Sequence, residues 1–432
     1  MFICSNINKK DGHLTFAGQD TTVLAGQYGT PLYLIDEDRV RQNINTYKTT
    51  LKKCFGERSR VLYAGKAGAF RQLYRILREE SCGIDVVSQG EIYTAYSAGY
   101  DMANAFYHGN SKTDQDITFA MDRNVGFFVL DNEEEILAVE REAAARKIVQ
   151  KALLRVTPGI DTHTYEAVNT GKVDSKFGNA IATGQAEKMT ELILSCPHIK
   201  LLGFHCHVGS QVFTEDVFER AAEIMLEFMA DMRNRFAFTG EMLNLGGGYG
   251  VRYVDTDPYL DVEQKIMDVA ARIGSTCERL GFPVPEILME PGRAIIADAG
   301  MTLYTVGAVK RIPGYKNYVS VDGGMADNPR YALYRSAYSC FNASRMDEEP
   351  SMTADLAGRC CESGDILQPA VNFPESTKRG DIIAVCTTGA YNYSMASHYN
   401  RLPKPPVVML KGGSSYIAVR RESIEDVTGL DL

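Results

Sequence analysis

The sequence predicts two architectures in succession, a parallel (β/α)8 barrel of the α/β class and then an all-β region. Eight short apolar runs alternate with amphipathic stretches between residues 36 and 290, which is the order of elements in such a barrel. These runs lack the alternation of a half-exposed strand, as is typical of parallel strands that helices cover on both sides. After about residue 300, strand and turn signals follow one another with little helix between them.

The barrel strands are expected at the apolar runs, of which VLYAG at 61–65 and GFFVL at 126–130 are clear examples. Eight strand–helix units fit a closed barrel, and a doubly wound open sheet remains the alternative because periodicity does not reveal closure. The expected strands are 61–65, 83–87, 105–108, 126–130, 152–157, 201–207, 242–246 and 286–290.

Helices are expected at the amphipathic stretches between those strands. The signals are clearest in NEEEILAVEREAAARK at 132–147, where Asn132 can cap the N-terminus. The glutamates after it favour the positive end of the helix dipole, and Arg146 and Lys147 favour the negative end. One helix opens the barrel at 36–53, and the others are expected at 68–80, 90–99, 113–123, 132–147, 182–196, 214–235 and 261–281.

The all-β region is expected to form a β-sandwich or β-barrel domain. Its strand and turn signals are clearest in MTLYTVGAVKRI, NYVSVDGG, DIIAVCTTGAY and PVVMLKGGSSYIAVRRE. ICSNI, HLTFAG and TPLYLI near the N-terminus carry the same signals, so we expect them to join that domain. The chain would then divide into N-terminal strands at 1–33, the barrel at 34–300 and the C-terminal β domain at 301–432.

The composition is that of a globular chain and argues against several functional classes. The 432 residues are 45% hydrophobic and 23% charged, and the net charge of −9 lacks the basic excess of nucleic-acid-binding proteins. No apolar run approaches the roughly 18 residues of a membrane span, and the N-terminus has no signal-like segment. Ten cysteines without a Cys-x-x-Cys pair predict free thiols in a reducing cytoplasm. We therefore expect a cytoplasmic protein without a bound metal that binds neither nucleic acid nor membrane.

Polar residues gather at the carboxyl ends of the expected barrel strands, where (β/α)8 barrels carry their active sites. Three consecutive glycines let backbone N–H groups approach a phosphate closely, and a hydroxyl and a guanidinium on the same rim suit the same anion. The candidates are Lys66 after the first strand, His207 and Ser210 at the sixth, Gly246, Gly247 and Gly248 at the seventh, and Glu290 and Arg293 at the eighth.

This combination suggests a cofactor. Lys66 stands at a buried strand end, where desolvation would favour the neutral, nucleophilic amine. A phosphate cradle beside such a lysine suggests pyridoxal phosphate held as a Schiff base, and Glu290 would keep the pyridine nitrogen protonated. Each feature alone also has a structural explanation: a tight turn for the glycines, a surface position for the lysine and a core position for His207.

Seven motifs in chain order resemble those of the fold-type III, alanine-racemase-like decarboxylases that depend on pyridoxal phosphate. They are YAGKA, HCHVGSQ, LNLGGGYG, EPGR, VDGGMADNPRYALY, CCESGD and GAYNYSMASHYNR. Within this family the motifs are most similar to those of the diaminopimelate-specific enzymes. The resemblance runs from YGTPLYLID at 28–36 to YNYSMASHYN at 391–400 and so covers nearly the whole chain.

The resemblance implies pyridoxal 5'-phosphate as the cofactor and assigns residues to it. Lys66 would be the Schiff-base lysine, His207 would stack on the cofactor ring, and Tyr391 would contact both cofactor and substrate. Ser210, Gly246, Gly247 and Gly248 would contact the phosphate, Glu290 would lie at the ring nitrogen, and Pro291, Gly292 and Arg293 would complete the lining of the site.

The resemblance also implies the reaction, which is decarboxylation of meso-2,6-diaminopimelate to L-lysine and CO2 as the last step of lysine biosynthesis. Cys361 would be the general acid and would reach the active site of the neighbouring subunit, so an obligate homodimer with shared sites is implied. Arginine suits a carboxylate through its planar fork of donors, and a spacing of four puts two residues on one helix face. Arg293, Arg330 and Tyr334 would bind the substrate's distal carboxylate, and Glu362 its distal ammonium.

Related functions remain alternatives at this point. A decarboxylase of ornithine, arginine or carboxynorspermidine is the main one, although a simple diamine-type substrate would favour an acid where this chain has Arg330. A racemase of the same fold needs acid–base groups on both faces of the reacting carbon, and a non-catalytic cofactor-binding barrel would lack the β domain. Gln89 and His398 depart from the family's usual glycine and asparagine, and CESGD selects Cys361 over Cys360.

Overall fold

The computed structural model describes residues 2–160, 175–213 and 216–432. The chain forms two compact units. The barrel unit comprises residues 43–250 and 260–294, and the β unit comprises residues 1–42, 251–259 and 295–432. The β unit is therefore assembled from three separate stretches of the chain.

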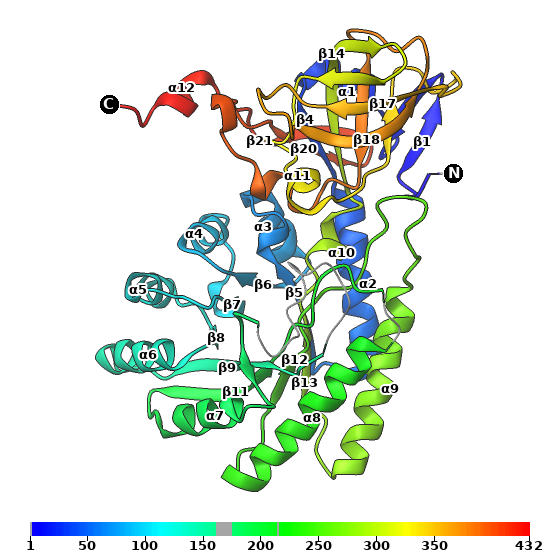
Figure 1. Ribbon diagram of the computed structural model, residues 1–432. Helices are drawn as coiled ribbons and strands as arrows, with labels where there is room; N and C mark the ends of the chain where they lie inside the picture. The colour runs from blue at the N-terminus through cyan, green and yellow to red at the C-terminus, as the bar shows by residue number, and fades with distance from the viewer. Residues whose placement is uncertain (1, 161–174, 214–215) are drawn as a thin grey trace. The chain divides into compact units, whose positions relative to one another are not determined.

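Eight parallel strands close into a barrel, which confirms the predicted fold class (Figure 1). The barrel closes where β8 pairs with β9, with Phe127 opposite Lys151 and Leu130 opposite Leu154. This pairing excludes the open, doubly wound sheet. The barrel strands are β5 (Ser59–Ala64), β6 (Gly83–Val86), β7 (Ala105–Tyr107), β8 (Phe127–Leu130), β9 (Gln150–Thr157), β11 (Ile199–His205), β12 (Met242–Asn244) and β13 (Glu286–Met289), and the short β10 (Asn179–Ala180) pairs with β9.

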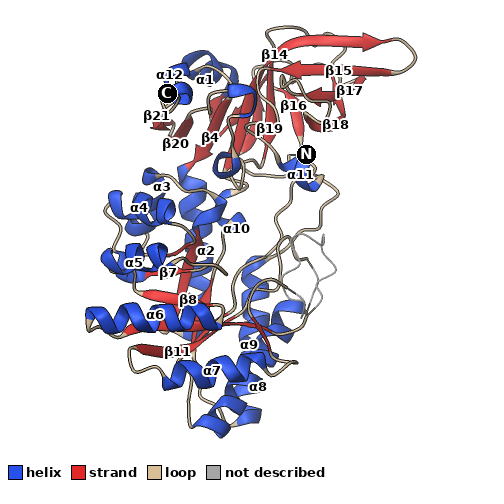
Figure 2. Cartoon of the chain, turned by 60° about the vertical axis from the view of Figure 1, so that its left-hand side comes forward, coloured by secondary structure: helices blue, strands red, loops and turns tan. Residues whose placement is uncertain are grey.

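The eight helices expected with the barrel are all present and surround its strands (Figure 2). Asn132 caps α6 as predicted, because its Oδ1 accepts a hydrogen bond from the backbone N–H of Glu135 at 3.0 Å. The helices are α2 (Glu37–Phe55), α3 (Arg71–Glu79), α4 (Gln89–Ser97), α5 (Asp114–Asp122), α6 (Glu133–Arg146), α7 (Gln185–Ser195), α8 (Val217–Phe236) and α9 (Val262–Leu280), and the 3-10 helices are η1 (Gly65–Ala67) and η2 (Met102–Asn104).

Apolar side chains fill the interior of the barrel. Phe106 and Phe127 stack there with their ring centroids 4.2 Å apart. Because every member of this cluster comes from a strand and none from a helix, the cluster lies inside the barrel. It gives the rim that carries the polar residues a rigid base. Its members are Leu62, Phe106, Phe127, Val129, Leu153, Leu202, Met242 and Leu288.

The β unit is dominated by strands, as the sequence predicts for the C-terminal region. Its large sheet runs in the order β18-β17-β15-β14-β4-β20-β21, with β19 paired to β14 and β16 paired to β19. A small sheet, β1-β2-β3, is separate. The strands are β1 (Ile7–Lys10), β2 (His13–Phe16), β3 (Gln19–Asp20), β4 (Leu32–Asp36), β14 (Gly300–Ile312), β15 (Lys316–Val321), β16 (Cys340–Asn342), β17 (Met352–Ala357), β18 (Ile366–Phe373), β19 (Ile382–Cys386), β20 (Val407–Lys411) and β21 (Ser414–Val419).

One N-terminal segment differs from the prediction of strand and turn. Residues Thr21–Tyr28 form helix α1, because the Asp20 carboxylate accepts hydrogen bonds from the backbone N–H groups of Thr22 at 2.8 Å and Val23 at 3.4 Å. This cap offsets the weak helix propensity of a segment that contains glycine and β-branched residues. The remaining helices are short: α10 (Arg293–Ile296), α11 (Arg330–Tyr334), α12 (Ile424–Thr428), η4 (Tyr393–Met395) and η5 (Tyr399–Arg401).

Two further properties bear on the sequence predictions. All ten cysteines are free thiols. Among the helices of the described ranges, none combines the length and the apolar character that crossing a membrane requires.

Candidate active site

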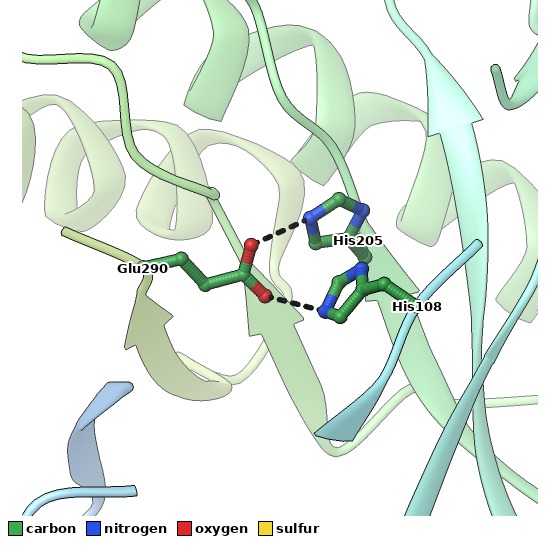
Figure 3. A group of neighbouring side chains, drawn as sticks. All are labelled: His108, His205 and Glu290. Carbon is green, nitrogen blue, oxygen red and sulfur yellow. Dashed lines mark hydrogen bonds and ion pairs between the residues drawn. The ribbon is translucent and has the colours of Figure 1, made fainter. Parts of the chain in front are cut away.

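A buried acid and two histidines meet at the carboxyl ends of the barrel strands (Figure 3). Glu290 follows β13, His108 follows β7, and His205 is the last residue of β11. His108 Nε2 lies 3.0 Å from Glu290 Oε1, and His205 Nε2 lies 3.1 Å from Glu290 Oε2. Asn244, at the end of β12, donates a hydrogen bond from Nδ2 to Glu290 Oε1 at 2.5 Å. Residues at the ends of four strands therefore form a cluster around one carboxylate.

The charges of this cluster follow from its burial and its pairings. Burial acts to raise the pKa of Glu290, but attraction to His108 and the contacts with both imidazoles outweigh it and hold that pKa well below its usual range. Burial acts to lower the pKa of His108, but the negative charges of Glu290 and Asp85 raise it to about 9. Burial lowers the pKa of His205 to about 4 against the opposing pull of Glu290. At neutral pH the cluster therefore contains a carboxylate, an imidazolium and a neutral imidazole.

These three side chains also place possible metal-ligand atoms within 4.8 Å of one another. The carboxylate nevertheless has its partners already, because both of its oxygens lie within hydrogen-bond distance of an imidazole nitrogen. The cluster is thus held together without an ion, and an ionised, buried carboxylate also suits the protonated ring nitrogen of a cofactor such as pyridoxal phosphate.

The glycine loop after β12 forms a cradle that side chains could not occupy. An added Cβ at Gly247 would lie 2.2 Å from the carbonyl oxygen of Glu290, and one at Gly248 would lie 2.1 Å from that of Gly209. Gly246 has φ +66, in the left-handed region that favours glycine. Arg293 Nη2 donates a hydrogen bond to Ser210 Oγ at 3.0 Å, so a cation and a hydroxyl predicted for the phosphate lie together. These groups fit an anionic phosphate.

His207 lies beside this cradle. The backbone N–H of Gly247 donates to His207 Nδ1 at 3.3 Å. Burial together with the charge of Lys66 and Arg155 holds the pKa of His207 well below its ordinary value, so the ring is neutral. A neutral imidazole at this point can pack its face against an aromatic ring without adding a charge.

Lys66 is exposed, which corrects the expectation of a buried lysine. Strand β5 ends at Ala64, and the turn η1 carries Lys66 past the strand end, with Gly65 and Ala67 buried on either side of it. The segment after β13 packs against this turn. The backbone N–H of Ala64 donates to the carbonyl oxygen of Pro291 at 3.3 Å, and a Cβ on Gly292 would lie 2.9 Å from the Cβ of Ala64.

In the β unit, a buried guanidinium is surrounded by aromatic rings. Arg330 begins α11, and its Cζ lies 5.3 Å from the ring centroid of Tyr391, 5.7 Å from that of Tyr334 and 5.8 Å from that of Tyr253. Its Nη2 donates to Ser336 Oγ at 3.1 Å. Within the described ranges, no carboxylate forms an ion pair with Arg330 and its buried Nε has no hydrogen-bond partner. A buried cation of this kind suits an anionic ligand.

Cys361 and Glu362 lie between β17 and β18, and both are exposed. The backbone N–H of Cys361 donates to Asn400 Oδ1 at 2.8 Å. Cys360 is less accessible, and burial together with the negative charge of Asp365 raises the pKa of its thiol to about 12. Of the two neighbouring thiols, Cys361 is the more accessible.

The two departures from the family pattern have ordinary local roles. Gln89 begins α4 beside its capping residue Ser88, and its Nε2 donates to Asp116 Oδ1 at 2.8 Å. His398 is exposed and pairs with Glu422, with 2.7 Å between Nε2 and Oε2.

Sequence reasoning missed His108, His205, Asn244 and Asp85 in the barrel unit and Tyr253 in the β unit. A signal was present for three of them, because Asn244 and His205 end their strands and His108 follows its strand directly. The rule that strand ends carry the site would have selected these three. Tyr253 had no such signal, since only the folded chain brings it to Arg330.

Known proteins resemble this chain over nearly its whole length. A family model described as the pyridoxal binding domain of pyridoxal-dependent decarboxylases matches residues 38–297. A curated relative named diaminopimelate decarboxylase, from Bacillus subtilis (strain 168), is 42% identical over 98% of this chain and 95% of its own length. Another with that name, from Staphylococcus aureus (strain COL), is 41% identical over 97% of each chain.

Solved structures are also similar to this chain over nearly its whole length. The crystal structure of diaminopimelate decarboxylase from M. jannaschii in co-complex with L-lysine has a TM-score of 0.91 at 28% identity and covers 100% of this chain and 99% of its own. The diaminopimelate decarboxylase from Helicobacter pylori complexed with L-lysine has a TM-score of 0.85 at 28% identity and covers 95% of this chain and 98% of its own.

Proposed function

The chain belongs to the pyridoxal-dependent decarboxylases and, within them, to the diaminopimelate decarboxylases, and from this membership we propose that it converts meso-2,6-diaminopimelate to L-lysine and CO2. The observation that carries the assignment is 42% identity over 98% of the chain with a relative of that name. Its cofactor is pyridoxal 5'-phosphate. The reaction would take place in the cytoplasm, in line with ten free thiols.

The barrel unit would hold the cofactor. The cradle of Gly246, Gly247 and Gly248, together with Ser210 and Arg293, would bind the phosphate, and Lys66 would attach the cofactor covalently. Glu290 would meet the ring nitrogen, and His207 would pack on the ring face. When bound, pyridoxal 5'-phosphate supplies an electron sink for the charge that remains on carbon after CO2 leaves. The residues of the chain bind, orient and transfer protons around it.

The substrate carries a distal group with both an ammonium and a carboxylate. Arg330 would bind that carboxylate with Tyr334 and Arg293, and Tyr391 would contact both substrate and cofactor. Glu362 would bind the ammonium. The support for this assignment is that Arg330 is a buried cation that forms no ion pair with a carboxylate within the described part of the chain. A site built for a simple diamine-type product would favour an acid there instead.

Proton transfer would require two subunits. The thiol Sγ of Cys361 would give its proton to the carbon that has lost CO2, and Cys361 and Glu362 of the partner subunit would serve each site. The exposure of both residues supports this arrangement, because a residue that acts on another molecule has to be accessible. The protein would then be an obligate homodimer with a division of labour between a cofactor barrel and a β domain that completes the site.

A substrate assay tests the reaction. The purified protein is supplied with pyridoxal 5'-phosphate and meso-diaminopimelate, and CO2 and lysine are measured against ornithine and arginine as alternative substrates. Lysine formation without comparable turnover of the other two is the expected result. Turnover of ornithine without lysine formation would contradict the assignment.

The attachment residue has its own test. Lys66→Ala protein should not retain the cofactor after borohydride reduction, as read by mass spectrometry of the intact chain. A reduced adduct on the variant would show that another amine holds the cofactor.

A further inference from the structure

The environment of Glu290 leaves one acceptor position open. A carboxylate oxygen has two lone-pair positions. Asn244 Nδ2 donates to Oε1 at 2.5 Å, and His108 Nε2 forms an ion pair with the same oxygen at 3.0 Å, so two nitrogens already face Oε1. On Oε2 only His205 Nε2 approaches, at 3.1 Å, among the described residues. One lone pair of Oε2 is therefore available to a further donor.

The two histidines reach Glu290 from different electrostatic settings. His108 Nε2 also lies 3.6 Å from Asp85 Oδ1, so it stands between two acids. His205 has no second acid, and its buried Nδ1 has no hydrogen-bond partner within the described ranges. A proton on Nδ1 would be an unsatisfied buried donor, so His205 carries its single proton on Nε2, where it bonds Glu290.

We propose that the two histidines are positioning residues with unequal tasks. His108 is the imidazolium that keeps Glu290 ionised beside Asp85. His205 is a neutral donor that orients Oε2 and leaves one lone pair of that oxygen for the protonated ring nitrogen of the cofactor. This inference rests on the proposed function only through the assignment of Glu290 to that nitrogen. Its physical basis is that two buried carboxylates cannot both remain ionised without a cation between them.

The other charged groups around the cluster do not replace His108. Lys66 and His108 both act to lower the pKa of Asp85, which burial and Glu290 raise to about 7. Arg155 on β9 and the neutral His207 also face the cluster, and burial lowers the pKa of the Arg155 guanidinium against the opposing pull of Asp131 and Glu290. Of these groups, His108 alone forms an ion pair with both Asp85 and Glu290.

A matched pair of substitutions separates charge from hydrogen bonding. Both His108→Gln and His205→Gln retain an N–H donor, but only His108→Gln removes a positive charge. His108→Gln should weaken binding of pyridoxal 5'-phosphate about tenfold or more, and His205→Gln should weaken it about threefold or less. In the His108 variant the affinity should also fall as pH decreases from 8 to 6, because Glu290 then takes up a proton. Equal effects of the two substitutions would overturn the proposal.

A double substitution adds a second test of the same idea. Asp85→Asn removes one of the two acids, so it should restore part of the cofactor affinity that His108→Gln loses. Failure of this rescue, with both proteins folded by circular dichroism, would show that the charge of His108 does not compensate the two acids.

The apoprotein provides a test that needs neither cofactor nor substrate. The chain has seven histidines, and their ring nitrogens can be followed by 15N NMR. One imidazole, absent in His108→Gln, should stay protonated up to about pH 9, and another, absent in His205→Gln, should stay neutral down to about pH 4. If both imidazoles titrate near pH 6.5, the proposal is wrong even for an enzyme that forms lysine. If the two imidazoles differ in protonation as expected but no lysine forms, the proposed function fails and the positioning roles stand.

Discussion

Arg330 and Asp327 are both buried ionisable residues of the β unit, yet their surroundings lead to opposite charge states. Burial acts to lower the pKa of Arg330, but three tyrosine neighbours outweigh it and raise that pKa, so the guanidinium stays charged. Burial raises the pKa of Asp327 to about 7, although Tyr304 donates a hydrogen bond to Oδ1 and the backbone N–H of Gly324 donates to Oδ2. The first residue suits a ligand, and the second serves the packing of the domain.

Replacing Arg330 with lysine tests substrate recognition. Lysine keeps the charge but loses the planar fork, so we expect kcat/KM for diaminopimelate to fall about ten- to a hundredfold, mostly through KM. The matched control is Arg335→Lys, because Arg335 lies on the same short segment but is exposed. If both variants had the same kcat/KM, Arg330 would not be part of the substrate site.

Replacing Asp327 with asparagine tests the buried acid. The pKa of about 7 in the folded state lies above the value of about 3.9 for an unfolded chain, so the folded protein retains a proton that the unfolded chain has released. The free energy of unfolding should therefore fall as pH rises from 4 to 7, by at most about 1.4 kcal/mol per pH unit. When measured by urea unfolding at pH 5, 6, 7 and 8, the free energy of unfolding should decline less with pH in Asp327→Asn than in the unsubstituted protein. Identical slopes would mean that another group dominates.

Single residues also show how far the sequence can be used. Position along the chain was enough to find Lys66 and Glu290 at strand ends, but the exposure of Lys66 depends on the turn η1, which no periodicity reveals. The contact between Tyr253 and Arg330 depends on a long-range approach, because the two residues come from separate stretches of the chain.

At the level of elements, the barrel was predictable because each strand is an uninterrupted apolar run between clear helices. β5 and β9 differ from the expected ranges by only a residue or two at their ends. In the β unit the signals were weaker. β18 contains a proline, and α1 depends on its cap rather than on an apolar stripe.

The glycine loop is the element whose shape can be tested most directly. Gly247→Ala would place a Cβ 2.2 Å from the carbonyl oxygen of Glu290, so the loop would have to shift. We therefore expect a loss of cofactor affinity of about a hundredfold. Gly274→Ala on α9 is the control, because nothing lies within 4 Å of that position. The control should bind the cofactor normally and be more stable by about 0.5–1 kcal/mol. Normal cofactor binding by Gly247→Ala would mean that the loop does not form the cradle.

At the scale of the whole molecule, the proposed shared site predicts complementation. Lys66→Ala and Cys361→Ala should each be inactive, but a mixed dimer would contain one site with both native residues. After unfolding and refolding of an equal mixture, we expect about a quarter of the normal activity, because half of the dimers are mixed and each has one intact site. Mixing Lys66→Ala with Glu290→Ala is the control, since both residues would serve the site of their own subunit. No recovery in the first mixture would argue against sharing.

An interior strand of the large sheet in the β unit, β4, imposes an order on synthesis. β4 ends at Asp36, but its neighbours β14 and β20 begin at Gly300 and Val407. The ribosome therefore releases the whole barrel sequence before either neighbour of β4 exists. An apolar strand that waits this long for its partners is exposed to wrong pairing during translation. The barrel can form while synthesis continues, whereas the β unit matures only when the last part of the chain emerges.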